Sequence, residues 1–137
     1  LRANTAVGDL KAQKEILMGG KGVDFWTNIF DCDIVVADPR ALVIAKYFRN
    51  AFLETKVNFF NQIFDLCEKL NLNYEDVRKY VAQDSRIGDS HTMVTDERGF
   101  GGHCFPKDVQ ALLKTAEEQG IELSLIKEAN EYNKKIK

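Results

Sequence analysis

A glycine-rich loop that ends in a cysteine is the segment of the sequence best suited to chemistry. It reads Gly99-Phe100-Gly101-Gly102-His103-Cys104-Phe105-Pro106-Lys107-Asp108. Glycines let the backbone bend sharply and let a ligand approach the main chain closely. Pro106 predicts a helix that begins just after Cys104, and the free N–H groups and positive dipole end of that helix, with Lys107 nearby, favour the thiolate. The pattern predicts a nucleophile and, at the same helix start, a site for an anion such as a pyrophosphate.

The bland alternative is that Cys104 is a packing residue, because free cysteines are often buried and most glycine loops only turn the chain. Cys67 falls on an apolar helix stripe and Cys32 at a strand edge, so both are predicted to pack. Three cysteines without a CxxC pair argue against a disulfide framework or a zinc knuckle and favour a cytoplasmic location.

Two further pairs of side chains could do chemistry. His91 and His103 could bind a metal with Cys104, but adjacent residues rarely reach one ion and no third ligand recurs at helical spacing, so no metal is predicted. Lys46 and Asn50 stand four residues apart and therefore share a helix face, where they present an ammonium and an amide to one point. By spacing alone, a solvated surface is the better explanation of this pair.

Composition limits what the chain can be. Its 137 residues, 45% of them apolar, suffice for one ordinary core. With 19 Lys and Arg against 21 Asp and Glu, the net charge is -2, so the overall charge attracts neither nucleic acid nor an anionic membrane. No apolar run approaches the roughly 20 residues that a membrane span needs.

The elements that must position these residues are mainly helical. Asp38-Pro39 predicts the start of a long amphipathic helix over residues 40–70, and Asn73 predicts the start of another that ends near Asp84. Two short buried strands are expected before them, and a glycine-rich loop after them. The remaining ranges are strands at 14–18 and 32–37, a loop at 84–104, a helix from Pro106 to Gly120 and a last helix over 123–135.

The long helix would extend about 45 Å, more than a domain of this size usually covers. A second copy of the chain is therefore expected to cover it, which predicts a homodimer through residues 40–70.

Three segments resemble the UDP-glucose/GDP-mannose dehydrogenase family. Gly99 to Asp108 resembles its GFGGxCFxKD segment, residues 46–53 resemble KxxxNAFL, and residues 84–88 resemble DxRIG. The order and spacing match too. The resemblance, which is closest to UDP-glucose 6-dehydrogenases, implies that residues 1–38 end a Rossmann-like NAD-binding domain and that residues 39–137 form a helical central dimerisation domain. Leu1-Arg2 resembles the continuation of a family PEFL segment, so the sequence is expected to continue a longer chain and not to act alone.

The same resemblance implies a mechanism and roles for residues. NAD is the implied cofactor, and a nucleotide sugar is oxidised twice at C6 through a thiohemiacetal and a thioester on Cys104. Asp108 would position the hydrolytic water, and Lys46 and Asn50 would stabilise the oxyanion at C6. The remaining implied contacts are Arg86 with the substrate of the partner subunit, Phe100 and Gly101 with the sugar nucleotide, and Cys104 and Lys107 with NAD.

Alternatives to this function stay open at the level of sequence. The chain could be an inactive dimerisation module derived from the family, or its substrate could be GDP-mannose or UDP-N-acetylmannosamine. A peroxide-sensing thiol protein is a third interpretation, which requires a second cysteine able to resolve Cys104.

Overall fold

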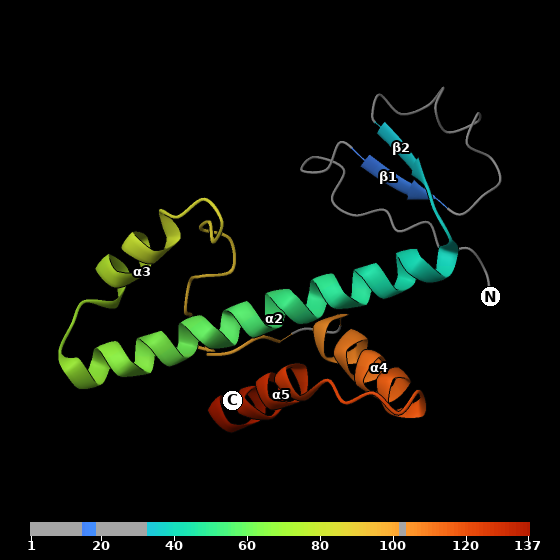
Figure 1. Cartoon of the computed structure of the whole chain (residues 1–137). Coiled ribbons are helices and arrows are strands. Elements are labelled where there is room, and N and C mark those ends of the chain that lie inside the picture. The colour runs from blue at the N-terminus through green and yellow to red at the C-terminus, as the bar shows by residue number, and fades with distance from the viewer. Residues whose placement is uncertain (1–14, 19–32, 102–103) are drawn as a thin grey trace. The chain divides into compact units, whose positions relative to one another are not determined.

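The computed structural model describes residues 15–18, 33–101 and 104–137, with side chains from residue 37 onward except those of residues 102–105. Two strands and four helices make up this part of the chain (Figure 1). The mainly helical fold class expected from the sequence is thereby confirmed. In chain order the elements are β1 (Glu15–Met18), β2 (Asp33–Val36), α2 (Pro39–Leu70), α3 (Tyr74–Ala82), α4 (Cys104–Glu118) and α5 (Ser124–Ile136).

The chain divides into two compact units, Leu1–Lys46 and Tyr47–Lys137. In the first unit β1 and β2 pair in parallel, with Glu15 opposite Asp33 and Met18 opposite Val36. Parallel pairing requires a crossover connection between the strands, as in α/β layers. The boundary expected between residues 38 and 39, where an NAD-binding domain would end and the central domain begin, stays a prediction. Among the described residues, no helix is long and apolar enough to cross a membrane.

Helix α2 starts and stops on local signals in the sequence. The Asp38 carboxylate accepts a hydrogen bond from the backbone N–H of Arg40 at 2.8 Å, and the Asp38 carbonyl accepts one from Leu42 N–H at 3.1 Å. The helix ends before Asn71, whose φ of 54° is left-handed, a conformation that asparagine tolerates better than most residues. At 32 residues it is about 48 Å long.

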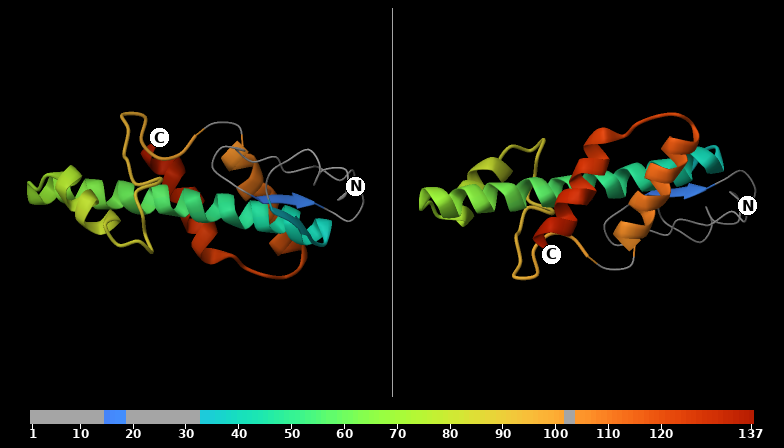
Figure 2. Two further views of the ribbon diagram at one scale, coloured as in Figure 1. Left: turned by 90° about the horizontal axis from the view of Figure 1, so that it is seen from above. Right: turned by 90° about the horizontal axis from the view of Figure 1, so that it is seen from below.

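Helix α2 buries several polar side chains and exposes a stripe of large apolar ones. Glu54, Asn58 and Asn61 are buried, whereas Phe52 and Phe59 are 68% and 55% exposed. The core beside α2 is small. It consists of Ala51, Val109 and Leu112, with Tyr47, Leu113, Leu123 and Ile126 packed around them. Helices α4 and α5 therefore cover one face of α2, and seen from below they lie in front of it (Figure 2).

Helix α3 and the loop after it are organised around a buried arginine. Asn73 caps α3, as expected, by accepting a hydrogen bond from Glu75 N–H at 2.9 Å. The guanidinium of Arg78 is buried and donates to Glu75, Asp89 and Thr92. Because these acceptors come from both α3 and the loop, Arg78 holds the loop against the helix.

Replacement of Arg78 by alanine should lower the free energy of unfolding by about 2 kcal/mol, because several charge-assisted hydrogen bonds are lost together. The neighbouring Lys79 is exposed and meets the same Glu75 at 3.7 Å, so Lys79→Ala should change it by less than about 0.5 kcal/mol. Urea denaturation followed by circular dichroism measures both. Equal effects of the two substitutions would show that the buried arginine is not what orders the loop.

Candidate active site

Helix α4 begins two residues earlier than the sequence predicted. It starts at Cys104 and not after it, so Pro106 stands at the third position of the first turn. Proline is tolerated there because the first N–H groups of a helix have no partner within the helix. Cys104 therefore lies within the positive end of α4, one turn before Asp108. Its side chain lies outside the described residues, as do Cys32 and His103.

Asn50 and Asp108 meet although 58 residues separate them. The Asn50 amide, on α2, donates to the Asp108 carboxylate, on α4, at 2.7 Å. Asp108 is buried, and the next residue, Val109, belongs to the core that joins α4 to α2. This packing fixes the carboxylate one helical turn after the cysteine and leaves it an acceptor for a proton or a water molecule.

The cationic residues singled out from the sequence are exposed. Lys46 lies one turn before Asn50 on α2 and belongs to the first compact unit. Lys107 is in the first turn of α4, where its charge adds to that of the helix dipole. Arg86 is 87% exposed at its side chain and pairs with Asp84 at 2.5 Å. All three cations are thus accessible to solvent in the described part of the chain.

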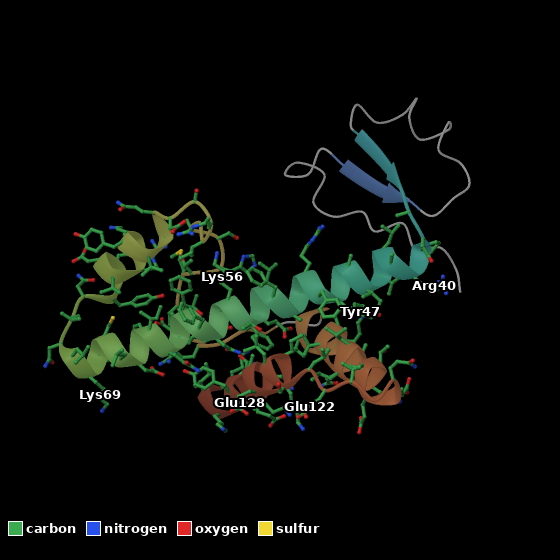
Figure 3. All side chains as sticks on the ribbon, in the orientation of Figure 1. Arg40, Tyr47, Lys56, Lys69, Glu122 and Glu128 are labelled. Atoms are coloured by element: carbon green, nitrogen blue, oxygen red, sulfur yellow. The ribbon has the colours of Figure 1, made fainter. Side chains whose placement is uncertain are left out.

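Arg86 stands on a tight turn that is tied to α2. The backbone N–H groups of Ile87 and Gly88 both donate to the Asp84 carbonyl, at 2.8 and 2.9 Å. The ammonium of Lys56 donates to the Ile87 carbonyl at 2.7 Å, and this side chain extends from α2 toward the segment after α3 (Figure 3). The turn therefore presents Arg86 outward while its backbone is held by α2.

The glycines before the cysteine lie close to a side chain of α5 and to that of the residue that follows this helix. A Cβ at Gly99 would lie 2.2 Å from Asn133 Oδ1, and one at Gly101 would lie 2.4 Å from Lys137 Nζ. The Asn133 amide accepts from Phe100 N–H at 2.8 Å and donates to Phe100 C=O at 3.1 Å. The sequence interpretation assigned the space beside these glycines to a ligand, whereas at Gly99 it holds Asn133. Phe100 itself is buried.

A second anchor holds the same loop to α2. Asn61 Oδ1 accepts from Arg98 Nε at 2.8 Å and from Gly99 N–H at 3.2 Å. Arg98 also pairs with Asp65 at 2.5 Å and stacks over Phe64, with Cζ 4.9 Å from the ring centroid. The backbone that leads to the cysteine is thus fixed by two asparagines, Asn61 and Asn133, that sequence reasoning did not single out.

Glu54 is a site residue that the sequence analysis missed. Its side chain is 2% exposed, and Oε1 has no hydrogen-bond partner. Burial, together with the negative charge of Asp108, raises the pKa of this carboxyl to about 8. The signal was present in the sequence, because polar residues recur at spacings of four, four and three along one face of the helix. They are Asn50, Glu54, Asn58 and Asn61.

Metal ligands do not gather in the described part of the chain, which contains no group of three or more His, Cys, Asp or Glu placed to hold an ion. His91 lies on the exposed loop, where its Nδ1 is 2.6 Å from Ser90 Oγ.

The family model described as the central domain of the UDP-glucose/GDP-mannose dehydrogenase family matches residues 41–135. The chain belongs to this family. The matched range includes Asn50, Cys104 and Asp108, so the contact between α2 and the start of α4 lies within the family's central domain.

Curated relatives and a solved structure agree with this assignment. The UDP-glucose 6-dehydrogenase of Rhizobium meliloti is 34% identical and the match covers 92% of this chain and 31% of that protein. The enzyme of the same name from Pseudomonas aeruginosa is 38% identical, over 76% of this chain and 22% of that protein. A UDP-glucose dehydrogenase from Pyrobaculum islandicum superposes with a TM-score of 0.76 at 29% identity, covering 89% of this chain and 29% of that one. The chain thus spans less than a third of each of these proteins.

Gly99→Ala should destabilise the protein by more than the left-handed backbone alone explains. Gly99 and Gly120 both have positive φ, 56° and 70°, but a Cβ at Gly120 meets nothing within 4 Å. Gly120→Ala should therefore cost about 1–2 kcal/mol of strain, and Gly99→Ala more, because Asn133 must also leave Phe100. Thermal unfolding of the two variants measures the difference. Equal losses would mean that Asn133 moves aside freely and does not hold the loop.

Proposed function

We propose that this chain is the catalytic-cysteine part of an NAD-dependent dehydrogenase that oxidises UDP-glucose to UDP-glucuronate, acting within a longer protein. Support comes from the hydrogen bond between Asn50 and Asp108, one helical turn from Cys104. That contact joins two of the three motifs that carry the family resemblance. The printed names of the relatives supply the substrate class. GDP-mannose or UDP-N-acetylmannosamine would require the same residues, so substrate comparison is part of any assay.

The proposed chemistry begins with the hydroxyl at C6 of the sugar. Bound NAD supplies the hydride acceptor for each of the two oxidations. The alcohol loses a hydride from C6 and a proton from oxygen, which gives an aldehyde. The thiolate of Cys104 then adds to the aldehyde carbon and gives the oxyanion of a thiohemiacetal, which loses a second hydride from C6 and becomes a thioester.

Hydrolysis of the thioester completes the reaction. Water adds to the carbonyl carbon, the C–S bond breaks, and the acid leaves while Cys104 returns to the thiolate. Asp108 is placed by its buried position and by Asn50 to orient that water and accept its proton. In the earlier steps Asn50 and Lys46 donate to the oxygen at C6, where negative charge develops.

The start of α4 fits a pyrophosphate as a binding group. Free N–H groups at the first turn of this helix and the exposed ammonium of Lys107 offer donors and positive charge to an anion. We assign this role toward NAD to residues 104 and 107, and a role beside the sugar nucleotide to Phe100 and Gly101. The chain's net charge of -2 leaves such binding to local cations.

Cys104→Ser in the full-length protein should release acid far more slowly than the parent. A serine ester is less electrophilic toward water than a thioester, so acylated enzyme or aldehyde should accumulate. Lys46→Ala should slow both oxidations about a hundredfold, and Asp108→Asn should slow hydrolysis more than hydride transfer. Single-turnover NADH formation together with mass spectrometry of the enzyme separates the steps.

Cys67→Ser is the matched control, because Cys67 lies on α2 and is only 4% exposed. It should leave the rates per folded molecule unchanged. Normal acid release by Cys104→Ser would overturn the covalent mechanism and would favour a structural module.

The partner that we propose for α2 is a second copy of the chain. Phe52, Phe59 and Leu66 are exposed and lie seven residues apart, so they recur along one stripe of the helix. Phe48 and Leu70 extend this stripe at spacings of four. Such a stripe fits the same stripe of another copy around a two-fold axis. In this assembly Arg86 would reach the partner's substrate, residues 1–38 would complete an NAD-binding domain, and the cytoplasm is the proposed location.

Phe52→Glu and Leu66→Glu should each convert the dimer into a monomer. In a two-fold interface each substitution occurs once in each copy, so it removes two apolar side chains and adds two charges. The dissociation constant should rise at least about a hundredfold. Light scattering at a fixed concentration reports the mass. Leu125→Glu is the control, because Leu125 is equally exposed but lies on α5. A dimer that persists in both α2 variants would place the interface elsewhere.

A further inference from the structure

Glu54 belongs to a row of polar side chains on the buried face of α2. Asn50, Glu54 and Asn58 follow one another at one helical turn each, so they occupy one face of the helix. The Asn50 amide points to Asp108 of α4, and the Asn58 amide points to α5, where Nδ2 donates to the Ala129 carbonyl at 2.6 Å. Glu54 therefore lies between two amides whose donors are already directed to other helices.

Two oxygen atoms of this polar row lack a hydrogen bond. Glu54 Oε1 and Asn58 Oδ1 are both buried, and neither has a hydrogen-bond partner. The orientation of the Asn58 amide is set by the Ala129 carbonyl, which can only accept. Both orphan atoms are thus acceptors. Side chains one turn apart on a helix are within reach of each other, so a single proton placed between these two oxygens would satisfy both.

The charge that acts on Glu54 comes from α4. Among the described residues, Asp108 of α4 is the charged group whose field acts on Glu54. From α5 the uncharged Ala129 carbonyl binds the neighbouring Asn58, and α2 itself contributes the neutral amides of Asn50 and Asn58. A second negative charge at position 54 would be buried beside the first, which is costly.

We propose that Glu54 is a positioning residue that stays protonated in the folded protein, donates its proton to Asn58 and so adds no second negative charge beside Asp108. It acts on the chemistry through Asp108, and in this respect it rests on the proposed function. A neutral Glu54 keeps the Asn50 amide directed to Asp108, whereas an ionised one would compete for that donor and repel the carboxylate. The protonation state itself is independent of any activity.

Infrared spectroscopy tests the proton directly. The difference spectrum between the protein and its Glu54→Gln variant should contain the carbonyl band of a protonated carboxylic acid at neutral pH. That band should disappear on titration with a midpoint near pH 8. Asp108→Asn should move the midpoint to lower pH, because it removes the charge that opposes ionisation. A band already absent at pH 6 would overturn the proposal and would leave the proposed function standing.

The pH dependence of the free energy of unfolding is a second test, because a carboxyl that keeps its proton on folding makes the protein less stable as the pH rises. The folded protein holds this proton up to about pH 8, whereas the unfolded chain releases it near the ordinary value of 4.5. The folding equilibrium constant should therefore fall about tenfold per pH unit between those values through Glu54 alone. Glu54→Gln, whose amide can also donate to Asn58, should fold as well as the parent at low pH and lose this dependence. Glu54→Ala should also lose the pH dependence, but it should fold less well than the parent at low pH, because alanine cannot donate a hydrogen bond to Asn58. An unchanged pH dependence in Glu54→Gln would contradict the proposal.

The role through Asp108 is tested in the full-length protein by the pH profile of acid release. In the parent, release should decline above about pH 8 as Glu54 ionises. In Glu54→Gln this decline above pH 8 should be absent. If the infrared band behaves as expected but both profiles coincide, Glu54 holds its proton without positioning Asp108, and the positioning role is wrong. If neither protein forms a thioester, the proposed function fails while the protonated Glu54 remains.

Discussion

The burial of a polar row on α2 is the constraint on which the rest of this chain depends. Buried amides and carboxyls must find partners, because an unpaired buried polar group is costly. Asn50 finds Asp108 on α4, Asn58 finds the Ala129 carbonyl on α5, and Asn61 finds Arg98 and Gly99 of the loop. One helix thereby fixes the positions of three other segments. The core of Ala51, Val109 and Leu112 adds apolar packing to these hydrogen bonds.

Opposite this polar row, α2 carries a stripe of apolar side chains that faces outward. A soluble helix usually buries its apolar stripe, but here Phe52, Phe59 and Leu66 remain exposed. The polar contacts within the chain and the proposed apolar contacts with a second copy would thus lie on opposite faces of one helix. This division lets a proposed dimer form without disturbing the site, and it explains how a helix of 32 residues serves a unit of modest size.

The loop before the cysteine is ordered by backbone contacts. Asn133 holds both polar groups of the Phe100 backbone, and Asn61 accepts from Gly99 N–H. Because Gly99 has no Cβ, Asn133 can lie where a side chain would otherwise stand. Such contacts at Gly99 and Phe100 would serve the proposed role of Cys104, since a misplaced reacting group loses much of its rate. The glycine pattern therefore has a structural cause in addition to any role toward a ligand.

The sequence by itself determined the helices, the motifs and the family. Caps at Asp38 and Asn73 and the apolar periodicity of residues 40–70 depend on neighbours along the chain, so they could be read locally. The start of α4 was misplaced because proline in a first turn does not mark which position of the turn it occupies. Only the tertiary structure decided that Asn50 meets Asp108, that Asn133 fills the space beside Gly99, and that Glu54 is buried. These facts join residues far apart in the chain, and which face of a helix becomes buried depends on what packs against it.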